Sequence, residues 1–143
     1  MTVWKSSIWA SNNIVDNFTV TGDLDVTGDI TVAGTITGRQ VPRVLSTTSS
    51  ATPTINTDNC DIYQLTAQAE AITSMTTNLS GTPVEGDVLI IEITGTAARA
   101  ITWGASFEES IVGLPATTAG TDKLTVCFMY NGVTDKWRCT GWV

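Results

Sequence analysis

Apolar and polar residues alternate without a break from Phe18 to Gly38. Every even position in this stretch is apolar or glycine, and every odd position except Ala33 is Thr or Asp. A period of two places successive side chains on opposite faces of an extended chain, so the stretch is predicted to have one dry and one wet face. The dry-face positions other than glycine are Phe18, Val20, Leu24, Val26, Ile30, Val32 and Ile36.

A six-residue repeat is superimposed on this alternation. The hexads V-T-G-D-L-D, V-T-G-D-I-T and V-A-G-T-I-T follow one another from Val20 to Thr37. Repeats of this kind cannot bury their own apolar face and need stacked neighbours, which one chain does not supply. Glycine at inward positions suits backbones that crowd around an axis. We therefore predict a short intertwined β shaft over 18–38 in a homotrimer, with two strands of an ordinary sandwich as the alternative.

Beyond residue 55 the pattern changes to short apolar runs separated by turn residues. The expected strands cover 60–66, 71–77, 88–93, 98–104, 123–130 and 136–143, and the expected loops include 78–87 and 105–122. Asn131-Gly132 is a strong turn signal between the last two strands. Short strands at this spacing are typical of a small sandwich or barrel. We therefore predict an all-β protein whose C-terminal domain, residues 56–143, is a β-sandwich of the jelly-roll-like kind.

Two further segments complete the predicted organisation. Residues 39–55 are rich in Thr and Ser, a composition typical of a linker. Residues 1–17 contain Trp4, Ile8 and Trp9, three large apolar side chains in a segment too short to enclose them. Such side chains either pack on the shaft or mark a contact with another protein, and the second interpretation is favoured. Segment 1–17 is therefore predicted to attach this protein to a partner.

The charge of the chain excludes two classes of partner. The 143 residues carry a net charge of −7, and only 15% of them are charged. Nucleic acids and anionic membranes both attract basic surfaces, so we expect neither as a partner. No apolar run is long enough to span a membrane, and the first residues lack the apolar core of a secretory signal. We expect the protein to be made in a cytoplasm.

Catalytic chemistry is poorly supported by the sequence. The chain has no histidine, which removes the commonest general base and metal ligand. Glu108 and Glu109 are adjacent, and consecutive residues of a strand face opposite ways, so they make a poor acid–base pair. Cys60, Cys127 and Cys139 lack the spacing of a disulfide framework or metal site and are interpreted as buried thiols. We expect no enzymatic activity, no cofactor and no metal centre.

Two sets of residues could bind a ligand, and this is the alternative to a purely structural role. Three aspartates, Asp23, Asp25 and Asp29, share the wet face of the predicted shaft. Copies of them from several chains could coordinate Ca²⁺, although plain solubility is the favoured interpretation. The second set is the three tryptophans Trp103, Trp137 and Trp142. Tryptophan rings can stack on sugars, but a place in the core or in a subunit interface is favoured here.

The order of several short segments resembles a known family. D-I-Y-Q-L-T-A, S-G-T-P-V-E-G-D-V-L-I-I-E-I, A-R-A-I-T-W, G-L-P-A-T-T and F-M-Y-N…D-K-W follow one another in the C-terminal half. This order is similar to a β-rich C-terminal domain of bacteriophage fibres and other virion structural proteins. The V-T-G-D repeat resembles the segments that precede such domains. The resemblance implies a homotrimeric, non-catalytic part of a virion.

The resemblance also implies where the protein acts. We expect a short trimeric fibre or spike, made in the host cytoplasm and displayed on the particle. It would attach to another virion structural protein through residues 1–17 and contact a receptor on the host surface. The alternative is a capsid decoration protein, a cement or head fibre that stabilises the shell. A polysaccharide-cleaving spike would need a longer β-helix and a pair of carboxylates between subunits.

Overall fold

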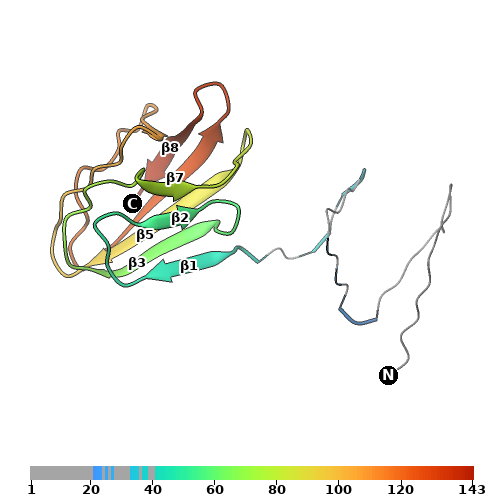
Figure 1. Cartoon of the computed structure of the whole chain (residues 1–143), viewed down its shortest axis with the longest axis horizontal. Coiled ribbons are helices and arrows are strands. Elements are labelled where there is room, and N and C mark those ends of the chain that lie inside the picture. Colours follow the sequence, from blue (N-terminus) through green and yellow to red (C-terminus); the bar gives the residue numbers. More distant parts are fainter. Residues whose placement is uncertain (1–20, 24, 26, 28–32, 36, 39–40) are drawn as a thin grey trace. The chain divides into compact units, whose positions relative to one another are not determined.

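The computed structural model describes residues 21–23, 25, 27, 33–35, 37–38 and 41–143. The chain divides into two compact units, Met1–Gly38 and Arg39–Val143. The described residues of the first unit are all exposed, and none of them lies in a strand. The described part of the second unit contains strands and loops but no helix (Figure 1), so the predicted all-β class is confirmed. Nowhere in the described ranges is there a helix long and apolar enough to cross a membrane.

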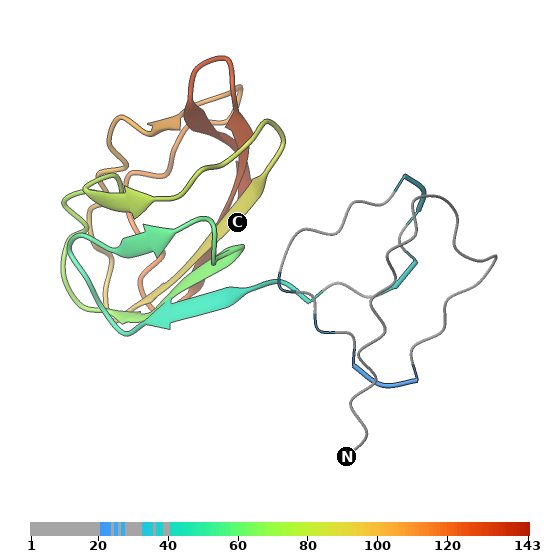
Figure 2. The same cartoon turned by 45° about the vertical axis from the view of Figure 1, so that its right-hand side comes forward.

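The described part of the second unit, residues 41–143, contains eight strands in two sheets (Figures 1 and 2). They are β1 (Val44–Thr47), β2 (Thr54–Asn56), β3 (Ile62–Gln68), β4 (Asn78–Ser80), β5 (Val88–Gly95), β6 (Phe107–Glu108), β7 (Lys123–Asn131) and β8 (Lys136–Trp142). The large sheet has the order β1-β3-β5-β7-β8-β6, and the small sheet pairs β2 with β4.

The large sheet is mixed, which differs from the predicted jelly-roll-like arrangement. Strands β1, β3 and β5 run parallel, β7 is antiparallel to both β5 and β8, and β6 is parallel to β8. Jelly rolls are antiparallel. Parallel neighbours need long connections, because the chain must return to the same end of the sheet. Here β2 lies in the connection from β1 to β3, and β4 lies in the connection from β3 to β5, so the two connections form the small sheet.

One cluster of buried side chains includes residues of both sheets. Along β5 the buried apolar side chains are those of Leu89, Ile91 and Ile93, at every second position. We call the face of the large sheet that carries them the inner face, and the opposite face the outer face. Ile55 of β2 is fully buried in the same cluster, and Leu79 of β4 packs against it. The small sheet therefore covers part of the inner face.

Aromatic rings fill the centre of this core. The rings of Trp103, Phe107 and Phe128 contact one another with centroid separations of 5.3, 5.2 and 4.9 Å. Two of the three pairs are edge-to-face, the arrangement that aromatic quadrupoles favour. Trp103 lies in the loop between β5 and β6, and Phe107 begins β6, so the stretch between β5 and β7 is anchored to the core.

The segment 39–55, predicted as a linker, contributes strands to the fold. β1 pairs with β3 along its whole length, and β2 begins at Thr54. The buried side chain of Gln68 binds both the backbone N–H and the carbonyl of Ser50, each at 2.9 Å. Threonine-rich sequence suits strands as well as loops, and here the contacts with β3 decide the outcome. The compact unit therefore extends upstream of residue 56.

Two predicted strands are replaced by loops. Residues 71–77 and 98–104 form one isolated bridge, between Ile72 and Ile101, and the backbone N–H of Met75 also donates to the carbonyl of Thr102 at 3.0 Å. A strand of three residues, β4, lies instead inside the predicted loop 78–87. Both apolar side chains at the bridge are buried in the core. The apolar residues of these segments are therefore buried in the core, although the segments do not pair as regular β-strands.

Candidate functional site

The residues predicted to attach and to trimerise the protein lie outside the residues that the structure describes. They are Trp4, Ile8 and Trp9 for attachment, and Phe18, Val20, Leu24, Val26, Ile30, Val32 and Ile36 for the shaft. Both sets stay predictions. Among the described shaft glycines, a Cβ added at Gly22, Gly34 or Gly38 would meet no atom within 4 Å. The described part of a single chain therefore does not crowd these glycines.

The structure offers no metal site within its described ranges. Asp23 and Asp25 are exposed, and Asp29 lies outside the described residues. No group of three or more His, Cys, Asp or Glu side chains in those ranges is placed to hold a metal ion. The Ca²⁺ alternative for the shaft therefore stays untested.

The adjacent glutamates and the cysteines have structural surroundings. Glu108 accepts a hydrogen bond from the side-chain amide of Asn131 at 2.9 Å and pairs with Arg138 at 2.8 Å. Glu109 accepts a hydrogen bond from a backbone N–H in the following loop. The three cysteines are unpaired, and two of them, Cys60 and Cys139, are buried. Removal of these two thiols from water raises their pKa, so they stay protonated and inert near neutral pH.

The three tryptophans of the second unit lie in different surroundings. Trp103 is buried and donates its indole N–H to the carbonyl of Pro115 at 2.8 Å. Trp142 is 48% exposed and donates its indole N–H to the carbonyl of Gly113 at 2.9 Å. Trp137 is buried and lines a pocket. The structure thus confirms a core position for two of the three.

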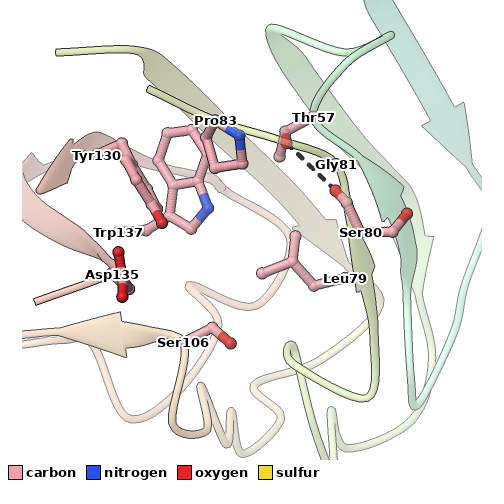
Figure 3. Close-up of a pocket in the computed structure, with 9 residues that line it drawn as sticks. All are labelled: Thr57, Leu79, Ser80, Gly81, Pro83, Ser106, Tyr130, Asp135 and Trp137. Carbon is pink, nitrogen blue, oxygen red and sulfur yellow. Dashed lines mark hydrogen bonds between the residues drawn. The ribbon is translucent and has the colours of Figure 1, made fainter. Parts of the chain in front are cut away.

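This pocket is the candidate functional site (Figure 3). It has a volume of about 170 Å³. One wall comes from the small sheet and the loop after it, and the other comes from β7, β8 and the residue before β6. Its lining residues are Thr57, Leu79, Ser80, Gly81, Pro83, Ser106, Tyr130, Asp135 and Trp137.

The aromatic wall is a cross-strand pair. Tyr130 on β7 lies directly opposite Trp137 on β8, and their rings meet edge-to-face with centroids 5.2 Å apart. The backbone N–H of Trp137 also donates to the carbonyl of Ser106 at 2.9 Å, which joins β8 to the residue before β6. The pairing of β8 with β7 and the bond from Trp137 to Ser106 fix the backbone that carries the indole ring.

Asp135 reaches the pocket from the turn between β7 and β8. Its backbone is left-handed, with φ at 53°, a conformation that Asp tolerates better than most residues. Two glutamates from other parts of the chain hold the start of this turn. Glu108 accepts a hydrogen bond from the Asn131 side chain, and Glu85 accepts one from the backbone N–H of Gly132 at 2.7 Å. Partial removal from water and the nearby Asp135 carboxylate raise the pKa of Tyr130, so its hydroxyl keeps its proton.

The opposite wall depends on a glycine. The backbone N–H and the hydroxyl of Thr57 both donate to the carbonyl of Ser80, at 3.0 and 3.2 Å (Figure 3). Gly81 follows with φ at 118°, and a Cβ added there would lie 2.1 Å from the Thr57 hydroxyl oxygen. Only glycine therefore fits the close approach of these two segments.

The pocket combines apolar surfaces with hydrogen-bonding groups and contains no Lys, Arg or His. Such a lining suits binding of a small neutral molecule better than acid–base or nucleophilic catalysis. Sequence reasoning singled out Trp137 and the Asn131-Gly132 turn signal beside it. It did not find Leu79, Ser80 or Asp135, because no local pattern indicates that these distant segments meet.

Comparison of the chain with models of protein families, with curated proteins and with solved structures found no match. Function is therefore argued from the residues and the geometry alone.

Proposed function

We propose that this protein is a non-enzymatic structural protein of a bacteriophage particle, a short homotrimeric fibre or spike. The hexad repeat over 18–38 is the observation that carries the proposal. Its apolar positions need partners, and stacked copies of the same repeat provide them. A compact all-β unit, Arg39–Val143, follows the repeat in the order that the resemblance to virion proteins implies. The sandwich-like head would be displayed on the shaft.

The outer face of the large sheet supports an assembly of several chains. Aligned neighbours across β1, β3, β5 and β7 form an apolar row of Val44, Ile62, Ile90 and Cys127. The exposed side chains of Val88 and Met129 pair beside this row. Contiguous apolar surface of this kind usually marks a contact with another protein. In the proposed trimer this face is available to neighbouring heads.

The mass of the full chain in solution tests the trimer. Light scattering should give three times the chain mass. Replacing Val26 and Ile30 with Asp should dissociate the trimer, because each buried side chain contributes about 1.5–3 kcal/mol. The matched control places Asp at Thr27 and Thr31 on the predicted wet face and should leave the trimer intact. A monomeric unmutated protein would contradict the proposal.

The position on the particle distinguishes the two virion functions. Electron microscopy of intact particles should show the protein as a projecting fibre or spike, whereas a capsid decoration protein would cover the shell. Trp4→Ala combined with Trp9→Ala should leave the trimer intact and release it from particles, since an interface Trp commonly contributes about 2 kcal/mol or more. If the double variant still purifies with particles at normal stoichiometry, attachment through residues 1–17 is wrong.

A further inference from the structure

The indole N–H of Trp137 has no hydrogen-bond partner within the described part of the chain, unlike those of Trp103 and Trp142. Trp137 as a whole is only 3% exposed, and a nitrogen sealed inside the protein without a partner would be costly. Among the described residues the single fully enclosed side-chain nitrogen or oxygen without a partner is Nε of Arg99. The Trp137 nitrogen is therefore not sealed in the core. Figure 3 shows it turned toward the space beside Leu79.

Hydrogen-bonding groups of the opposite kind line the same pocket. The carboxylate of Asp135 is an acceptor, and the hydroxyls of Tyr130 and Ser106 can both donate and accept. Figure 3 shows Asp135 and the Tyr130 hydroxyl close together at one end of the pocket. A ligand in this pocket can therefore offer an acceptor to the indole N–H and a donor to the exposed carboxylate, which also interacts with the Tyr130 hydroxyl.

The size and the charge of the pocket narrow the ligand further. Its volume of about 170 Å³ is below the roughly 300–1,000 Å³ of pockets for drug-sized ligands, so it suits a single ring. The one charged lining residue is Asp135, which disfavours an anion. A single carboxylate is also too few ligands for a Ca²⁺ or Mg²⁺ site. The Leu79 side chain and the Tyr130 ring supply apolar surface.

We propose that this pocket binds one neutral sugar ring, with an oxygen of the sugar accepting from Trp137 and a hydroxyl donating to Asp135. A sugar ring has hydroxyls at its edge and apolar C–H groups on its faces, and this combination matches the lining. The proposal adds a ligand class to the proposed function: displayed on a particle, the pocket would contact a neutral glycan of the host surface. The site itself does not depend on that placement.

The tryptophan N–H signals of the full-length protein test the site directly. In a ¹⁵N–¹H correlation spectrum, the Trp137 peak is identified by its loss in Trp137→Phe. The probes are the methyl glycosides of glucose, galactose and N-acetylglucosamine, with methyl glucuronide as the acidic control. At least one neutral glycoside should shift the Trp137 peak and leave the Trp103 peak in place, with a Kd on the order of 1 mM. The acidic control should bind more weakly.

Two variants and one matched control assign the binding to named groups. Trp137→Phe keeps an aromatic ring and removes the N–H, so affinity, measured by titration calorimetry, should fall about threefold or more. Asp135→Asn keeps a residue that tolerates positive φ but removes the charge, and should weaken binding about tenfold. Trp142→Phe, outside the pocket, should leave affinity unchanged. Thermal unfolding of each variant confirms that it is folded.

The proposal is overturned if no neutral glycoside shifts the Trp137 peak at about ten times the expected Kd. It is also overturned if binding survives both pocket variants, or if the glucuronide binds as tightly as the neutral probes. These outcomes are independent of the mass and microscopy experiments. A protein that binds sugar but is monomeric would contradict only the proposed function, and a trimer on particles that binds no sugar would contradict only the site.

Discussion

The two faces of the large sheet come from the same strands but differ in what covers them. On the inner face Leu89 and Ile91 are fully buried. On the outer face their neighbour Val88 is exposed, and Glu92 is half-buried, where it pairs with Lys123 at 2.9 Å. Inner-face side chains are fixed by packing on all sides, whereas outer-face side chains contact mainly their cross-strand neighbours. Stability should therefore reside on the inner face, and the outer face should be free to make contacts.

Removing part of the inner face's cover should have the largest effect. A chain of residues 56–143 lacks β1 and most of β2, including the fully buried Ile55, and leaves Gln68 without Ser50. It should be unfolded or aggregated by circular dichroism. A chain of residues 41–143 retains these elements and should unfold cooperatively. Cooperative unfolding of the shorter chain would show that β1 and β2 are dispensable, contrary to their contacts.

Neighbouring residues on β7 compare the two faces directly. Phe128 is buried on the inner face within the aromatic cluster, and Met129 is 45% exposed on the outer face. Phe128→Ala should lower the free energy of unfolding by about 3–5 kcal/mol, since it leaves a cavity. Met129→Ala, the matched control, should change it by no more than about 0.5 kcal/mol. Denaturant titration measures both, and equal losses would mean that the outer face is covered within one chain.

Gln68 is a polar exception in the core. It is fully buried, and its side chain makes three hydrogen bonds, two to Ser50 and one to the carbonyl of Glu70 at 2.8 Å. Gln68→Met keeps the volume but leaves buried backbone groups unpaired, and should lower the free energy of unfolding by about 1–3 kcal/mol. Gln64→Met, the half-buried neighbour on the same strand, is the control and should have a smaller effect. A neutral Gln68→Met would show that water replaces these bonds.

The smallest effect is expected where β1 is anchored at the edge of the sheet. Arg43 pairs with Asp61 at 2.5 Å, and this hydrogen bond holds the pKa of Asp61 below its ordinary value. A carboxyl group whose pKa is lower in the folded state raises the free energy of unfolding at pH values above its ordinary pKa. This contribution is lost as the pH falls through the lowered pKa. The Arg43 side chain is 53% exposed, so Arg43→Gln should cost no more than about 1 kcal/mol.

This cost should depend on pH in a defined direction. Unfolding free energies of the unmutated protein and of Arg43→Gln should differ most near neutral pH, where the Asp61 carboxyl group is ionised in both the folded and the unfolded state. They should converge as the pH falls through the lowered pKa of Asp61 in the folded protein. Lys136→Gln, a cation that forms no ion pair within the described residues, is the control. A difference that is constant with pH would mean that Arg43 acts through packing of its aliphatic stem.

Local patterns determined the fold class and the central strands. The short apolar runs in 88–93 and 123–130 predicted the strands β5 and β7, because the bias of such residues toward strands depends only on the local sequence. The turn signal at Asn131-Gly132 likewise marked the connection to β8. These features are local, so the sequence was sufficient to find them.

Only the tertiary structure decided which strands are neighbours and where the pocket lies. The segment 39–55 has too few apolar residues to indicate a strand, and β1 exists because β3 offers it a parallel edge. The pocket brings Thr57 and Ser80 close to Asp135 and Trp137, which are far away in the sequence. Such contacts depend on how the long parallel connections return across the sheet, and no local periodicity encodes that path. The physical reason is that strands far apart in the sequence pair, and bury their side chains, only after the long connections between them have folded back across the sheet.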